Sequence, residues 1–256
     1  LNEGDVLLAL STSGRSPNIL MALDAARRLG LVTIGFTGIK GQSLREICDR
    51  TNVLLIFDEV ITGFGRTGQM FAMDTFGVVP DIVAMAKGMG SGYAPLAGTI
   101  ASQKVADAFY GEDDQHVQFK HGHTFGGNAL SCAAGVANIR QILDNHMLEN
   151  AQRVGAYIQE RAEQFYAHPI VGDVRGVGLM LAIEFAMDRA TRRPFPPAAQ
   201  PGLRMQAIAK ERGLLMRANA DWIALGPPLI TTEDDVDQMF EILELSLGQV
   251  EAELKS

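Results

Sequence analysis

Short apolar runs alternate with helix-like segments along the first part of the chain, and this alternation is the strongest constraint on the fold. The runs VLLIF (53–57) and DIVAMA (81–86) contain no polar break, as expected of strands that are buried on both faces. Two earlier strand-like runs and two helix-like segments continue the same order, at 5–10, 18–30, 31–36 and 43–50. A strand–helix–strand order of this kind predicts an α/β fold, in which a mostly parallel sheet is sandwiched by helices and the crossovers are right-handed.

The pattern changes near residue 147. The elements expected beyond it are a helix at 148–165, one half-exposed strand at 174–185, a helix at 202–212, a strand at 221–229 and a closing helix opened by Thr231 or Thr232. A mixture of this kind, without regular strand–helix alternation, predicts a second, smaller α+β domain.

Charge and cysteine content exclude several classes of function. The formal net charge is -8 and the pI is near 5.1, so a surface for nucleic acid or anionic membranes is not expected. Cys48 and Cys132 are too few for a disulfide framework or a zinc site, which predicts a reducing, cytoplasmic setting. His121 and His123 have a metal-binding spacing but no third ligand nearby in sequence, so we predict no metal site. No apolar run approaches the ~20 residues that span a bilayer, and no signal-peptide pattern is present. The chain starts without a methionine, almost inside a strand, which predicts a fragment.

The stretch DEVITGFGRTG (58–68) contains a glycine pattern that needs an interpretation. Gly63, Gly65 and Gly68 have the spacing of a dinucleotide-binding turn, but such a turn must open a helix directly after a strand. Here several residues separate the strand from the glycines, and the segment that follows is interrupted by glycine and proline. A plain glycine-rich turn is therefore favoured over a nucleotide site.

Asp58 is the more informative residue of this stretch. It follows a buried strand, where an unpaired carboxylate is costly, so we expect it to have a cationic partner. Lys87 ends the next apolar strand and is either a snorkelling surface residue or a functional amine. Together the two residues fit pyridoxal phosphate, which needs a lysine for a Schiff base and a carboxylate that keeps the pyridine nitrogen protonated. Val60 is expected to point the same way from the strand as Asp58 and to pack on the ring.

Three segments, in this order, resemble the signature segments of class III, ω-type, pyridoxal-phosphate-dependent aminotransferases: LLIFDEVITGFGRTGQMFA, PDIVAMAKGMGSGYAPLAG and HTFGGNALSCAAG. The resemblance covers about residues 44–256. It implies a fold-type I enzyme in which Lys87 forms the Schiff base, Asp58 pairs with the pyridine nitrogen and Val60 packs against the ring.

The same resemblance implies a reaction and further contacts. The reaction is transfer of an amino group between an amine or ω-amino acid and a 2-oxo acid; aminomutase or decarboxylase activity on the same scaffold stays open. Thr124 is expected to reach the cofactor phosphate of the neighbouring subunit in a homodimer, and Arg217 to hold the substrate carboxylate. The family's upstream segments for the cofactor phosphate and for stacking on the ring are not found in this chain, so the activity is expected to be impaired.

The first residues resemble a different family. GDVLLALSTSGRSPNILMALDAARRLGLVTIGFTG is similar to the phosphosugar-binding core of the sugar isomerase (SIS) family, near the phosphoheptose isomerases. Ser11, Thr12, Ser13 and Ser16 offer hydroxyl and backbone N–H groups before a helix, which is a suitable anion site. A turn that merely caps the helix is the alternative.

The chain therefore resembles a chimera, natural or engineered. We divide it into an SIS-like βαβ segment (1–43), a partial cofactor-binding large domain (44–146) and a small C-terminal domain (147–256). Transamination is the leading function. The alternatives are a module that binds a sugar phosphate through the serine loop, and an inactive fusion.

Overall fold

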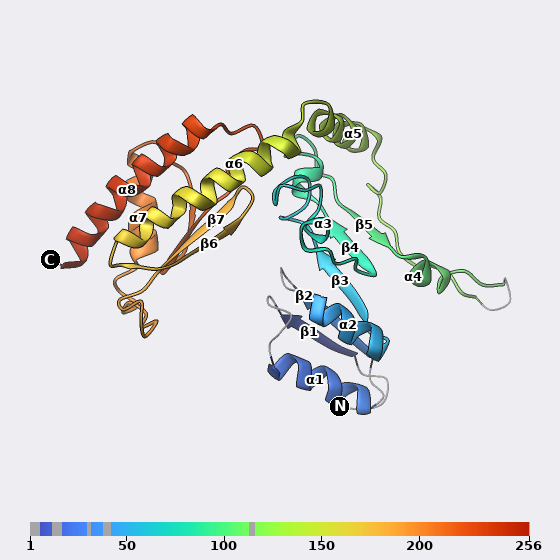
Figure 1. Cartoon of the computed structure of the whole chain (residues 1–256). Coiled ribbons are helices and arrows are strands. Elements are labelled where there is room, and N and C mark those ends of the chain that lie inside the picture. Colours follow the sequence, from blue (N-terminus) through green and yellow to red (C-terminus); the bar gives the residue numbers. More distant parts are fainter. Residues whose placement is uncertain (1–5, 12–16, 30–31, 38–41, 113–115, 256) are drawn as a thin grey trace. The chain divides into compact units, whose positions relative to one another are not determined.

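The computed structural model describes residues 6–11, 17–29, 32–37, 42–112 and 116–255. The chain divides into two compact units (Figure 1). The first unit comprises Leu1–Phe64 and Gln69–Asp144, and the second comprises Gly65–Gly68 and Asn145–Ser256. The α/β class expected from the sequence is confirmed, while the three-part division of the chain stays a prediction.

The first unit contains a five-stranded sheet in the order β1-β2-β3-β4-β5. Strands β1 to β4 are parallel, and β5 pairs with β4 in the antiparallel direction. The strands are β1 (Val6–Ser11), β2 (Val32–Thr37), β3 (Leu54–Asp58), β4 (Ile82–Met85) and β5 (Gly98–Ala101). The helices are α1 (Pro17–Arg28), α2 (Gln42–Thr51), α3 (Ala72–Phe76), η1 (Lys87–Met89, a 3-10 turn), α4 (Gln103–Asp107) and α5 (Ala129–Asp144). The mostly parallel sheet predicted from the apolar runs is therefore present.

This sheet joins the two segments that resemble different families. Strand β2 comes from the SIS-like segment and β3 from the aminotransferase-like segment, and they pair in parallel, with Ile34 opposite Leu54 and Phe36 opposite Ile56. Because ladder hydrogen bonds use only the backbone, strands of different ancestry can share a sheet when their register allows it.

Helix α2 packs on the sheet through a small apolar core. Cys48, Val53, Leu55 and Phe57 are buried together with Val78. Near this core, Arg45 Nη1 of α2 donates to Asp81 Oδ2 at 2.8 Å, and the same carboxylate oxygen accepts the Leu55 N–H at 2.8 Å. Asp81 thus connects α2 to β3 just before β4 begins.

The thiol of Cys48 gives the first unit a specific pH dependence. Burial raises the pKa of this thiol from 9.0 to about 11. Because the folded protein keeps the proton while the unfolded chain releases it, the free energy of unfolding is expected to fall between about pH 9 and about pH 11. Below about pH 9 this thiol has no effect on stability. Urea unfolding at several pH values checks the prediction, and the same fall in a Cys48→Ala variant would contradict it.

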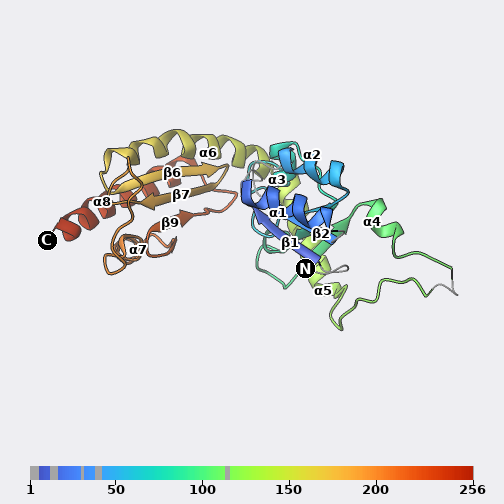
Figure 2. The same ribbon diagram turned by 90° about the horizontal axis from the view of Figure 1, so that it is seen from below.

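The second unit is an antiparallel sheet with a core of helices on one face. The sheet order is β6-β7-β9-β8. The strands are β6 (Val171–Val177), β7 (Met180–Phe185), β8 (Arg217–Ala218) and β9 (Trp222–Leu225). The helices are α6 (Met147–Ala162), η3 (Glu163–Ala167), α7 (Pro201–Glu211) and α8 (Glu233–Lys255) (Figure 2). This agrees with the predicted α+β character.

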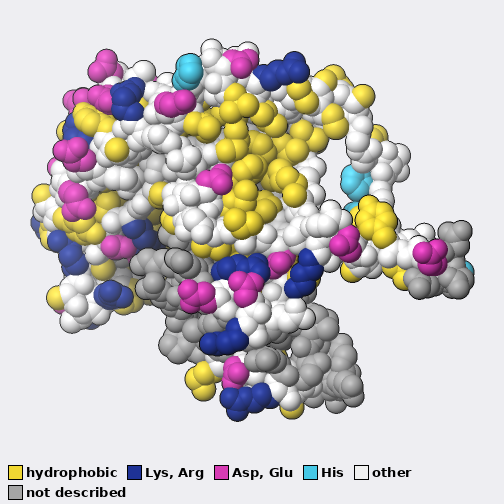
Figure 3. All heavy atoms as spheres, turned by 45° about the vertical axis from the view of Figure 1, so that its right-hand side comes forward, with side chains coloured by type: hydrophobic (Ala, Val, Ile, Leu, Met, Phe, Trp, Pro, Cys, Tyr) yellow, Lys and Arg dark blue, Asp and Glu magenta, His cyan; other side chains and the backbone are white. Residues whose placement is uncertain are grey.

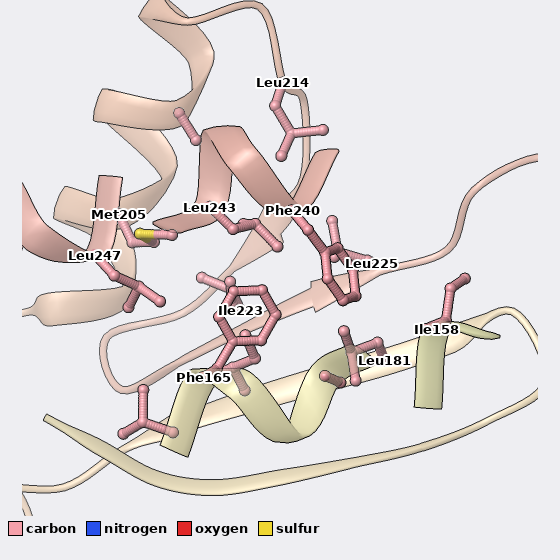
Figure 4. Close-up of a cluster of buried hydrophobic side chains, with 14 of the residues drawn as sticks. Ile158, Phe165, Leu181, Met205, Leu214, Ile223, Leu225, Phe240, Leu243 and Leu247 are labelled. Atoms are coloured by element: carbon pink, nitrogen blue, oxygen red, sulfur yellow. The ribbon is translucent and has the colours of Figure 1, made fainter. Parts of the chain in front are cut away.

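One buried cluster holds the second unit together. Leu181 and Ile223 of the sheet contact helix residues such as Ile158, Met205 and Phe240 (Figure 4). The rings of Phe165 and Phe240 lie at a centroid distance of 4.9 Å. Alternate residues of β7 and β9 are buried, so only one face of the sheet carries the core.

The prediction of a single strand at 174–185 is wrong. The segment forms a hairpin, in which β6 ends at Val177 and β7 begins at Met180. Gly178 adopts φ +54°, a left-handed conformation that glycine accepts at little cost and that permits the turn. The alternation of apolar residues continues across the turn, which concealed it in the sequence.

Candidate active site

The carboxyl ends of β3 and β4 bring two charged side chains to the same edge of the first unit's sheet. Asp58 is the last residue of β3 and lies opposite Ala84 of β4, and Lys87 follows β4 by two residues. Ala84 also accepts the N–H of Glu59 at 2.8 Å, so the pairing continues past the end of β3. Both charged side chains are exposed. Within the described ranges, neither forms an ion pair.

The environment of Asp58 differs from the expectation. A buried carboxylate with a cationic partner was predicted, but Asp58 is exposed and its Oδ1 accepts the Val60 N–H at 3.0 Å. Successive strand residues point to opposite faces, so Phe57 and Glu59 are buried on either side of Asp58. Its carboxylate is therefore exposed and available to a ligand.

Glu59 is the buried carboxylate of this region, although its place in the sequence did not indicate it. Its side chain is 1% exposed. The Oε atoms accept the N–H groups of Ala72 at 3.0 Å and Met73 at 2.8 Å, and the hydroxyl of Thr62. Glu59 thereby caps the start of α3 and closes the loop that follows Asp58. Phe71 at the N-cap of α3 has no side-chain oxygen to accept these N–H groups, but α3 was not among the helices expected from the sequence.

The segment after Asp58 forms consecutive turns and opens no helix directly. Gly65 and Gly68 have positive φ values of +96° and +93°, a backbone conformation that glycine adopts readily. This conformation accounts for glycine at these two positions. Val60 lies in these turns, beyond the end of β3, and is half-buried. Val60 is thus not a strand residue, and its expected direction and its contact with the ring stay predictions.

Lys87 itself has an unusual backbone conformation. It begins the 3-10 turn η1 with φ +36°, in the left-handed region that non-glycine residues rarely adopt. Its Nζ forms no hydrogen bond with any residue of the described ranges. The amine is therefore exposed, uncommitted and carried by a strained turn.

The other predicted contacts fall elsewhere. Thr124 is exposed in a turn at 124–127, ahead of α5. Ser11 ends β1, whereas Thr12, Ser13 and Ser16 lie outside the described residues. In the described part of the chain, His, Cys, Asp and Glu side chains form no group of three that could hold a metal ion.

Arg217 belongs to the second unit, where it is exposed on β8. It lines a groove of ≈ 710 Å³ together with Leu215, Met216, Leu225, Ile230 and Met239, among others. Arg66 donates to the carbonyl of Pro227, another lining residue, and burial lowers the pKa of the Arg66 guanidinium. The groove thus combines an apolar wall with an exposed cation, Arg217, and an exposed carboxylate, Asp235.

Comparison with known families fits these observations. Residues 39–247 match the family model described as aminotransferase class-III. The chain belongs to the class III aminotransferases. Residues 1–38 match the SIS domain model, so this class III chain carries an SIS segment ahead of its aminotransferase part, as the resemblance predicted. Class III aminotransferases depend on pyridoxal phosphate.

Relatives and solved structures support the assignment. The chain is 41% identical to diaminobutyrate–2-oxoglutarate transaminase of Halomonas elongata, over 81% of this chain and 45% of the relative. It is 40% identical to adenosylmethionine-8-amino-7-oxononanoate aminotransferase of Geobacter sulfurreducens, over 82% and 46%. The structure of an (S)-enantioselective omega-transaminase from Thermomicrobium roseum matches with a TM-score of 0.82 at 33% identity, over 91% of this chain and 55% of that one. The chain thus spans about half the length of the relatives it matches.

Two further findings concern the helices and the exposed side chains of the class III chain. In the described residues, no helix is both long and apolar enough to cross a membrane. Hydrophobic side chains are exposed on the molecular surface (Figure 3), among them Leu130, Val136 and Leu143 of α5. Phe119 and Phe125 of the segment before α5 are also exposed.

Proposed function

We propose that this chain binds pyridoxal phosphate at Lys87 and transfers an amino group between an amine or ω-amino acid and a 2-oxo acid. The observation that carries the proposal is the placement of Lys87 and Asp58 at neighbouring carboxyl ends of parallel strands, both exposed and without ion-pair partners among the described residues. In open α/β sheets this edge is where ligands bind. The relatives named for diaminobutyrate and 2-oxoglutarate support the substrate class.

The side chains present fit the cofactor. A free primary amine can bond covalently to an aldehyde, and an exposed carboxylate can hold a proton on a pyridine nitrogen. Pyridoxal phosphate, once bound, supplies an electron sink for the carbanion that forms when the substrate loses a proton. Lys87 Nζ would hold the cofactor and, as a free amine, would take the proton from the substrate carbon and return it. Asp58 keeps the ring nitrogen protonated.

The remaining roles complete the proposal. Val60 packs on the ring, Thr124 contacts the phosphate held by the neighbouring subunit of a homodimer, and Arg217 holds the substrate carboxylate. The exposed aromatic side chains before α5 support a homodimer, because an exposed apolar surface of this kind favours association. A cytoplasmic location accords with two free cysteines.

The experiment that tests this function is covalent mapping. The purified chain is incubated with pyridoxal phosphate, its visible spectrum is recorded, and the adduct is reduced with borohydride and located by peptide mapping. We expect an absorbance band and a label concentrated on Lys87. A label spread evenly over the surface lysines would sink the proposal.

A second candidate function rests on the SIS match at residues 1–38. We propose that Ser11, Thr12, Ser13 and Ser16 bind a phosphate group, either that of a sugar phosphate or that of the cofactor. Calorimetric titration with a sugar phosphate tests the first source, and cofactor affinity of a Ser11→Ala, Ser13→Ala double variant tests the second. If neither measurement shows binding that depends on these serines, this second function is abandoned. If Lys87 also remains unlabelled, the chain is an inactive fusion.

A further inference from the structure

The turn that carries Lys87 is held by hydrogen bonds at successive carbonyl groups. The carbonyl of Ala86 accepts the Met89 N–H at 2.9 Å, and the carbonyl of Lys87 accepts the Gly90 N–H at 3.2 Å. These two bonds define the 3-10 turn. They leave the next two carbonyls, those of Gly88 and Met89, to find partners outside the turn.

Asn138 of α5 supplies both partners. Its Nδ2 donates to the Gly88 carbonyl at 2.8 Å and to the Met89 carbonyl at 3.1 Å. An amide nitrogen carries two hydrogens, so a single side chain can satisfy both carbonyls. Asn138 is half-buried, and one helical turn earlier the buried Gly135 packs directly against Leu96. Helix α5 therefore meets the turn at close range, with the amide aimed at its backbone.

The turn needs such support because its conformation is strained. Lys87 has φ +36°, and strained residues persist only where their surroundings hold them. Gly88, the next residue, has little conformational preference of its own. On its other side a Cβ would lie 3.0 Å from Phe64 Cβ and 3.2 Å from the Gly63 carbonyl, so the turn rests on the loop after β3. Asn138 holds the turn from the α5 side.

We propose that Asn138 is the positioning residue for Lys87. Its hydrogen bonds hold the Gly88 and Met89 peptide groups in place. They thereby hold the left-handed backbone of Lys87, which sets the direction in which the Lys87 side chain leaves the turn. This inference rests on the proposed function of Lys87 as the cofactor lysine. The Asn138 amide donates to backbone carbonyls of the turn and not to the Lys87 amine, so it acts through the backbone.

The test uses two variants and a matched control, all made in the whole 256-residue chain. Asn138→Ala removes the donor, and Asn138→Asp places a carboxylate against two carbonyl oxygens. The control is Gln159→Glu, because Gln159 Nε2 bridges the carbonyls of Gly178 at 3.1 Å and Met180 at 3.2 Å in the second unit. The control makes the same amide-to-carboxylate change at the same kind of two-carbonyl bridge, away from Lys87 in the sequence and in the other compact unit.

Two readouts are measured. The first is amide hydrogen exchange at Met89 and Gly90 without cofactor. The second is the ratio of borohydride-fixed pyridoxal phosphate on Lys87 to that on Lys104, an exposed lysine of α4 in the same unit. We expect both Asn138 variants to exchange at least about tenfold faster and to lose at least about tenfold in the labelling ratio, because tenfold corresponds to one ordinary hydrogen bond and each variant loses two. Gln159→Glu is expected to change neither readout.

The outcomes separate this inference from the proposed function. Unchanged exchange at Met89 and Gly90 in both Asn138 variants overturns the inference. Faster exchange with an unchanged labelling ratio also overturns it, because Asn138 would then be merely structural. If the natural chain shows no preference for Lys87 over Lys104, the proposed function fails; the exchange measurement then decides by itself whether Asn138 holds the lysine's backbone.

Discussion

Replacing Lys87 by alanine is expected to abolish the visible absorbance band and the selective borohydride-fixed label completely. Only a primary amine can form the bond to the cofactor, and Lys87 is the lysine beside the carboxylate at the neighbouring strand end. Residual label should fall to the level of an ordinary surface amine. The measurement is the visible spectrum before reduction and peptide mapping after it.

Lys104→Ala provides the matched control for this prediction. Lys104 is also exposed in the first unit, but its Nζ donates to Asn52 Oδ1 at 2.9 Å and it lies on α4. The absorbance band is expected to survive this change unaltered. A band that persists in Lys87→Ala, or that disappears in Lys104→Ala, would place the cofactor on another amine.

Replacing Glu59 by alanine is expected to destabilise the first unit by about 4 kcal/mol, because three hydrogen-bond donors lose their charged acceptor in a buried place. Glu59→Gln keeps the volume and one acceptor oxygen, so its cost is expected to be smaller, about 2 kcal/mol. Urea unfolding followed by circular dichroism measures both variants. Glu46→Ala, an exposed residue of α2, should change stability by less than about 0.5 kcal/mol.

The single tryptophan makes this experiment selective. Trp222 lies on β9 of the second unit, so its fluorescence reports unfolding of that unit. The Glu59 variants are expected to shift the circular-dichroism transition of the first unit, and to leave the fluorescence midpoint in place. An equal shift in both signals would contradict independent unfolding of the two compact units.

The sequence could predict those features that depend on neighbours along the chain. Strand-like apolar runs indicated β1 to β4. In β3 and β4 only alternate residues are buried, so the expectation that these two strands are buried on both faces is wrong. Helical spacing indicated α1, α2, α6, α7 and α8. Thr232 and Asp235 bond reciprocally at the start of α8, as expected from a capping threonine. The motif order also sufficed to predict the class III family.

Features that depend on residues distant in the chain were decided by the tertiary structure. Glu59, not Asp58, is buried because its partners are the free N–H groups of α3, more than ten residues later. Asn138 meets the Lys87 turn across about fifty residues. Local periodicity indicates which face of an element is buried. It does not indicate which distant backbone N–H or C=O group a polar side chain will hydrogen-bond. By itself the sequence determined strands β1 to β4 and the candidate amine. Only packing decided which carboxylate is buried, which stays available, and what holds the lysine in place.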